Sequence, residues 1–140
     1  MAYDKILLPV DHSHVSERAV FAARDLAILS KGEVRVLHLR EREAGSKAGP
    51  VPPGETSADA RAVIDAAVTI LTDAGVNAHG EVRNTIYGYA AKEIVADAKE
   101  NEADIIVMGS RGHGDLAGLV LGSTAHKVIH LTDRPVLIIR

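Results

Sequence analysis

Short apolar runs alternate with amphipathic segments along most of this 140-residue chain, and this alternation constrains the fold more than any other feature. The runs are rich in Val, Ile and Leu and occur at residues 5–10, 34–39, 76–82, 104–108 and 136–139. Each run is continuous rather than alternating, which is typical of strands buried on both faces of a parallel sheet. Five such strands are therefore predicted.

The segments between the runs predict helices, because their apolar residues recur at helical spacing. These residues are Val20, Ala23 and Ala27 in the first helix, Val63, Ala67 and Leu71 in the second, and Ile94 and Ala98 in the third. Strands separated by helices pair in parallel through right-handed crossovers, which places helices on both faces of the sheet. The sequence therefore predicts a doubly wound α/β fold in a single domain covering residues 1–140.

Capping residues support the helix boundaries. Ser13 or Ser16 is predicted to cap the start of the first helix, and Gly32 to end it. Thr56 or Ser57 is predicted to cap the start of the second helix, and Gly75 to end it. Residues 40–55 are rich in Gly and Pro and form the one long irregular segment, which we interpret as a surface connector.

Composition and charge exclude several classes of protein. The net charge is −3 and no short segment gathers Lys or Arg, so no nucleic-acid partner is expected. The apolar runs are far shorter than the roughly 20 residues of a membrane helix, so no membrane partner is expected either. The chain opens directly on a strand-like run without a secretion leader, which favours a cytoplasmic protein.

A glycine-rich stretch marks the predicted functional site. Gly109, Gly112, Gly114 and Gly118 follow the fourth strand, and the sequence 122–124 (Gly-Ser-Thr) begins the last helix. Glycines let an oxyanion approach backbone N–H groups, and a helix N-terminus offers unpaired N–H groups with a positive dipole end. A phosphate chain suits both features. Ser123 and Thr124 are equally well explained as helix caps.

Two commoner phosphate motifs do not fit this stretch. A Walker motif is excluded because Gly122 is followed by Ser and no lysine stands at the required position. Residues 112–117 match the dinucleotide pattern formally, yet they follow the fourth strand and lie well before the helix that they should open.

What the residues do match is a family pattern. The motif consists of Gly109-x-x-Gly112, nine further residues and then Gly122-Ser123. It closely resembles the motif of the ATP-binding class of the universal stress protein family. The resemblance extends to residues 6–11, 36–39 and 134–138, and so covers nearly the whole chain. It departs at residues 87–90, where Tyr-Gly-Tyr-Ala replaces the Gly-x-Pro of many relatives.

The resemblance implies the sheet order 3-2-1-4-5, an adenine nucleotide alpha hydrolase-like fold, and an ATP site. Pro9, Val10 and Asp11 would surround adenine and ribose between walls formed by Leu39 and Met108. Asp11 would also suit an ATP-bound Mg²⁺. The implied phosphate-binding residues are Gly109, Gly112, Gly122, Ser123 and Thr124, and Arg111 and His113 are candidates for further phosphate contacts.

The family resemblance also implies a homodimer. Val136, Leu137, Ile138 and Ile139 form the last strand, which lies at a sheet edge in the implied order. An exposed apolar edge is a liability unless it is paired, and a second copy would pair it.

The implied function is a nucleotide-dependent regulatory module of the stress response, whose bound ATP is sensed by an unidentified partner protein. The alternative is a slow ATPase or an autophosphorylating phosphotransferase, with Ser110, Ser123 or Thr124 as phosphoacceptor. Whether the chain is an enzyme stays open, and no catalytic residue is assigned.

The histidines are interpreted structurally. His126 and His130 stand four residues apart on one helix but lack an evident third ligand. His12 and His14 flank Ser13 before the first helix, where we expect a turn rather than half of a metal site. His38 lies within a strand and is expected to be a hydrogen-bonded core residue.

Overall fold

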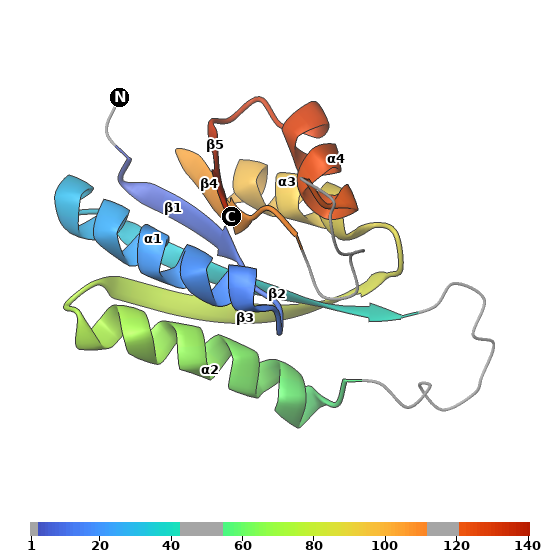
Figure 1. The fold of residues 1–140 in the computed structure, drawn as a ribbon, viewed down its shortest axis with the longest axis horizontal. Helices are drawn as coiled ribbons and strands as arrows, with labels where there is room; N and C mark the ends of the chain where they lie inside the picture. The colour runs from blue at the N-terminus through green and yellow to red at the C-terminus, as the bar shows by residue number, and fades with distance from the viewer. Residues whose placement is uncertain (1–2, 43–54, 112–120) are drawn as a thin grey trace.

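The computed structural model describes residues 3–42, 55–111 and 121–140. These residues form a five-stranded parallel sheet in the order β3-β2-β1-β4-β5, together with four helices (Figure 1). In chain order the elements are β1 Lys5–Pro9, α1 His14–Ser30, β2 Glu33–Arg42, α2 Ser57–Asp73, β3 Asn77–Ile86, α3 Ala90–Glu100, β4 Ile105–Gly109, α4 Ser123–Leu131 and β5 Val136–Ile139. The predicted α/β fold and strand order are confirmed.

Both faces of the sheet are buried, as the continuous apolar runs predict. Successive residues of a strand point to opposite faces, so Ile6 and Leu8 pack with residues of α1 and α2. Leu7 and Ile106 pack on the other face with residues of α3 and α4. Figure 1 shows the helices distributed over both faces in this way. Two apolar clusters therefore hold the sheet in place.

The starts of α1 and α2 follow the capping prediction. The Ser13 hydroxyl accepts a hydrogen bond from the Ser16 N–H (3.0 Å). Thr56 and Asp59 form a capping box, in which each side chain accepts the other residue's N–H at 3.0 Å. These hydrogen bonds from Thr56, above all that from its backbone, lower the pKa of the Asp59 carboxyl. The box fixes the chain at the start of α2, next to Glu55.

Two predicted helix boundaries are wrong in detail. The left-handed residue that ends α1 is Lys31 (φ 56°) rather than Gly32. Gly32 is needed for space instead, because a Cβ there would lie 2.5 Å from the carbonyl oxygen of Tyr3. The N-cap of α4 is Gly122, so Ser123 and Thr124 are its first helical residues and not its caps.

The irregular connector begins later than predicted. β2 continues to Arg42, because β3 runs alongside it to Ile86 and the Tyr87 N–H donates to the Arg42 carbonyl (2.6 Å). The apolar pattern ends earlier because the last residues of β2 are charged. Residues 43–54 of the predicted connector lie outside the described part of the chain.

A charged network joins α3 to the sheet on the same face as the second apolar cluster. The carboxylate of Asp97, which is fully buried, accepts two hydrogen bonds from the guanidinium of Arg35 (2.9 Å each). Arg35 also donates to Glu81, and Arg83 lies 3.5 Å from Asp97. These contacts, chiefly the hydrogen bonds with Asp97, raise the pKa of Arg35 above its ordinary value.

No helix in the three described segments combines the length and apolar character that crossing a membrane requires.

Candidate functional site: a cleft at the switch point

A cleft of about 820 Å³ opens beyond the carboxyl ends of the central strands. β1 pairs with β2 on one side and β4 on the other, so the connections that follow β1 and β4 lead to opposite faces of the sheet. Doubly wound folds bind their ligands at this kind of switch point. The volume lies within the range of small-molecule sites. This cleft is therefore the candidate site.

Nine of the twelve predicted site residues line the cleft. They are Pro9, Val10, Asp11, Leu39, Met108, Gly109, Arg111, Ser123 and Thr124. Gly122 lies directly before Ser123 as the N-cap of α4. Gly112 and His113 fall outside the described residues.

The floor of the cleft is apolar. Val10, Ile94 and Met108 line it and are almost completely buried. They come from the end of β1, the first half of α3 and β4, which only the sheet order brings together. A flat apolar group of a ligand would be shielded from water here.

The start of α4 provides the polar end of the cleft. The Gly122 N–H donates to the carbonyl of Ser110 (2.5 Å), which fixes the helix start against the end of β4. The N-cap residue Gly122 has no side chain that could cap this helix. The first N–H groups of a helix have no intrahelical partner and attract anions. Arg111 and Lys127 add positive charge to the lining.

Asp11 is held in position by the turn that starts α1. Its Oδ1 accepts a hydrogen bond from the Ser13 N–H (2.7 Å), and its own N–H donates to the Ser16 hydroxyl (2.8 Å). These contacts orient the carboxylate at the edge of the cleft, where Asp11 is part of the lining.

Carboxylates outnumber fixed positive charges in the described lining. The lining contains four carboxylates, those of Asp11, Glu41, Glu55 and Asp59, and two fixed cations, those of Arg111 and Lys127. Burial of part of the Glu41 side chain raises the pKa of its carboxyl, and the negative charge of Asp11 raises it further. An anionic ligand would therefore bind here more readily together with a cation.

Three residues that the sequence did not assign to a site meet on the α2 side of the cleft: His12, His38 and Glu55. Glu55 Oε1 lies 2.9 Å from His12 Nε2 and 2.5 Å from His38 Nε2. Sequence analysis predicts that His12 lies in a turn and that His38 is a core residue. His38 is indeed buried and hydrogen-bonded. Only its position near the end of the predicted strand 34–39 could have indicated a site.

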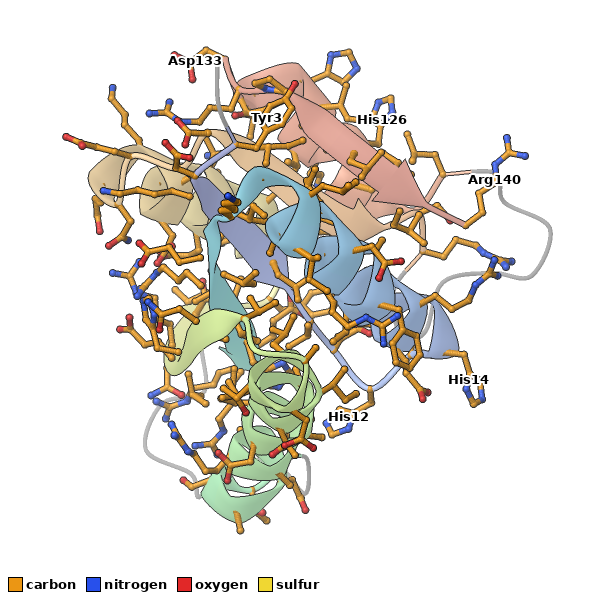
Figure 2. The ribbon with its side chains drawn as sticks, turned by 90° about the vertical axis from the view of Figure 1, so that its left-hand side faces the viewer. Tyr3, His12, His14, His126, Asp133 and Arg140 are labelled. Atoms are coloured by element: carbon orange, nitrogen blue, oxygen red, sulfur yellow. The ribbon has the colours of Figure 1, made fainter. Side chains whose placement is uncertain are left out.

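The other described histidine pair is not part of this cluster. The rings of His126 and His130 are 4.5 Å apart on α4, and both residues are exposed. Figure 2 shows His126 on the opposite side of the molecule from His12, and His14 directed away from His12. Within the described residues, the three-residue cluster is the one group with the spacing of a metal site.

The fold and the cleft place the chain among doubly wound α/β proteins with a ligand cleft at the switch point. Comparison with known proteins is more specific. The model of the "Universal stress protein family" matches residues 2–140. Universal stress protein YxiE of Bacillus subtilis is 38% identical over 148 residues, covering 99% of each chain. The chain belongs to the universal stress protein family.

Two solved structures of the family are similar to this chain and contain nucleotides. The universal stress protein from Archaeoglobus fulgidus in complex with dAMP has a TM-score of 0.75 at 26% identity and covers 100% of both chains. A universal stress protein in complex with cAMP has a TM-score of 0.73 at 27% identity, covering 100% of this chain and 98% of the other.

Proposed function

We propose that the cleft binds ATP and that the protein acts as a nucleotide-dependent regulatory module of the stress response. The observation that carries the proposal is the combination, in one cleft, of an apolar floor with a helix start whose N-cap is a glycine. The floor, formed by Val10, Ile94 and Met108, suits an adenine ring. The α4 start, with Ser123 and Thr124 in its first turn, suits phosphate oxygens.

The nucleotides of the two similar structures support adenine as the base. Both ligands consist of adenine, a sugar and one phosphate group, as dAMP in one protein and cAMP in the other. The proposal of a triphosphate rests on the glycine-rich sequence between Gly109 and Ser123, which is long enough to follow a phosphate chain. Gly112 and His113 remain predicted contacts of that chain.

Mg²⁺ is proposed to accompany ATP. The residues fit this pairing, because the lining carries more carboxylates than fixed cations and Asp11 is held at its edge. Mg²⁺ prefers oxygen ligands and usually binds through one or two carboxylates and the substrate phosphates. Asp11 is the candidate ligand, and Arg111 would contact the phosphates.

Whether bound ATP is consumed distinguishes the module from the alternative of a slow ATPase or phosphotransferase. The hydroxyl groups of Ser123 and Thr124 line the cleft and are candidate phosphoacceptors. Ser110 is buried and outside the described lining, which makes it a poorer candidate.

Freshly purified protein is expected to carry a bound adenine nucleotide, because the cleft buries the base and holds the phosphates. The measurement is denaturation followed by chromatography and mass spectrometry of the released nucleotide, together with calorimetric titration of nucleotide-free protein with Mg-ATP. Stoichiometric ATP supports the module, and steady release of ADP supports the enzyme. No bound nucleotide and no binding of Mg-ATP contradicts the proposal.

A homodimer through β5 is also proposed. β5 lies at the edge of the sheet, as the implied order requires, and Leu137 at its centre is 39% exposed. The outer edge of this strand, which pairs with no other described strand, can join the β5 of a second copy about a twofold axis. A cytoplasmic location and a partner protein that senses the bound nucleotide both stay predictions.

We expect Leu137→Lys to weaken the dimer at least tenfold, because two copies of the new charge would meet across the twofold axis. Sedimentation velocity over a range of micromolar concentrations measures the effect. Leu29→Lys on α1 is the matched control, since Leu29 is 83% exposed and lies on another element. A wild-type protein that sediments as a monomer contradicts the proposed interface.

A further inference from the structure

The cluster of His12, His38 and Glu55 has the composition of a transition-metal site. Its donor atoms, one from each residue, all lie within 4.8 Å of one another. The residues come from the turn after β1, from β2 and from the position before the α2 capping box, so three separate elements hold them. All three line the cleft.

The hydrogen bonds of His38 call for either a proton or a metal ion between its ring and Glu55. His38 Nδ1 lies 2.7 Å from the carbonyl oxygen of Val10, and a carbonyl only accepts, so Nδ1 carries a proton. In neutral imidazole the other nitrogen, Nε2, then has a lone pair. This lone pair points at a carboxylate oxygen of Glu55 only 2.5 Å away. Two acceptors at this distance require a proton or a metal ion between them.

His12 is the third residue of the cluster and approaches the same carboxylate oxygen. Its Nε2 lies 2.9 Å from Glu55 Oε1, and its ring meets the His38 ring edge to face, with centroids 5.7 Å apart. Three donor atoms from separate elements thus converge around one point. A single metal ion can be bound by all three at once. Without a metal, a proton between His38 and Glu55 and an Nε2–H donated by neutral His12 would occupy the same contacts.

The surroundings of His38 are those of a metal ligand. A ligating histidine nearly always donates its other ring N–H to a carbonyl or carboxylate, which fixes its tautomer and orientation. The carbonyl of Val10 does this for His38. His38 is also almost completely buried, so its ring is held rigidly.

Two of the three donor separations are close to those around a tetrahedral ion, and the third is within 4.8 Å. Bonds of about 2.0–2.1 Å to nitrogen and oxygen place the ligand atoms of a tetrahedral zinc ion about 3.3 Å apart. The two distances to Glu55 Oε1 are 2.9 Å and 2.5 Å. The carboxylate therefore needs to move away by less than about 1 Å.

The ligand types select the metal. Two imidazoles and one carboxylate suit Zn²⁺ and similar first-row ions, whereas Mg²⁺ prefers oxygen ligands alone. The site is therefore chemically distinct from the oxygen-rich environment expected for Mg²⁺ at Asp11. Three protein ligands leave the fourth position of a tetrahedral zinc ion open.

We propose that His12, His38 and Glu55 bind one Zn²⁺-type ion in the wall of the cleft, with its open coordination position available to water or to a ligand oxygen. The ion adds two positive charges to a lining in which carboxylates outnumber fixed cations. This proposal does not depend on nucleotide binding, because all of its ligands are supplied by the protein.

The test is a calorimetric titration of chelator-treated, nucleotide-free protein with Zn²⁺, repeated with Co²⁺ and followed by visible absorption. The protein used is His126→Ala/His130→Ala, which removes the helical histidine pair as a competing site. We expect one tight equivalent. His12→Ala and Glu55→Gln are expected to weaken it at least tenfold each, while His14→Ala is the matched control and has no effect.

His12 and Glu55 are chosen because their side chains are 46% and 20% exposed, so the fold should tolerate both changes. Thermal unfolding without metal checks this for each variant. The proposal is overturned if no equivalent binds, or if His12→Ala and Glu55→Gln bind Zn²⁺ as tightly as their parent. Protons between the two imidazole rings and the Glu55 carboxylate would then hold the cluster together.

Discussion

Asp97→Ala is expected to lower the free energy of unfolding by about 3–5 kcal/mol, because removing the buried carboxylate breaks a buried ion pair and leaves Arg35 with the more exposed Glu81 as its partner. Asp97 is fully buried, and its carboxylate holds Arg35 through two hydrogen bonds and lies within 3.5 Å of Arg83. Chemical denaturation by urea measures the change, and the melting temperature should fall by roughly 10 °C or more.

Glu100→Ala is the matched control for this prediction. Glu100 belongs to the same helix and pairs with Arg83 at 3.3 Å, but its side chain is 61% exposed. Exposed pairs contribute about 0–1 kcal/mol, so this variant should unfold almost as the wild type does. Equal stability losses for the two variants would show that burial of Asp97 is not what makes the network important.

Gly122→Val is expected to abolish retention of nucleotide and to weaken binding of Mg-ATP at least a hundredfold. Gly122 is buried at the N-cap of α4, and its N–H donates to the Ser110 carbonyl. Valine is a poor N-cap residue, and its branched side chain needs space at a buried position. The first turn of α4, with Ser123 and Thr124, should therefore move out of the geometry that suits phosphates.

Three further variants make the Gly122 experiment specific. Gly122→Ala adds a single methyl group and should have a smaller effect than valine. Thr124→Val keeps the shape of the side chain and removes only a hydroxyl group from the cleft. Thr69→Val makes the same change on the exposed face of α2 and is the matched control for Thr124→Val. If folded Gly122→Val protein retains as much nucleotide as the wild type, the start of α4 is not the phosphate site.

Much of the fold could be predicted because its signals are local. The apolar run of β1 is a continuous pattern within one strand. The spacing of Val63, Ala67 and Leu71 is likewise a pattern within one helix. The ends of elements were less predictable. β2 extends through charged residues because β3 pairs with it, and Lys31 adopts the left-handed conformation where Gly32 had been expected to do so.

The sequence by itself determined the alternation of strands and helices and the glycine-rich stretch after β4, because periodicity, capping and backbone freedom depend on neighbouring residues. Only the tertiary structure decided which distant side chains meet. Glu55 joins His38 across 17 positions and His12 across 43, and Arg35 joins Asp97 across 62. Those contacts depend on strand order, register and the paths of the crossovers, and none of these is encoded in the local pattern around any one residue.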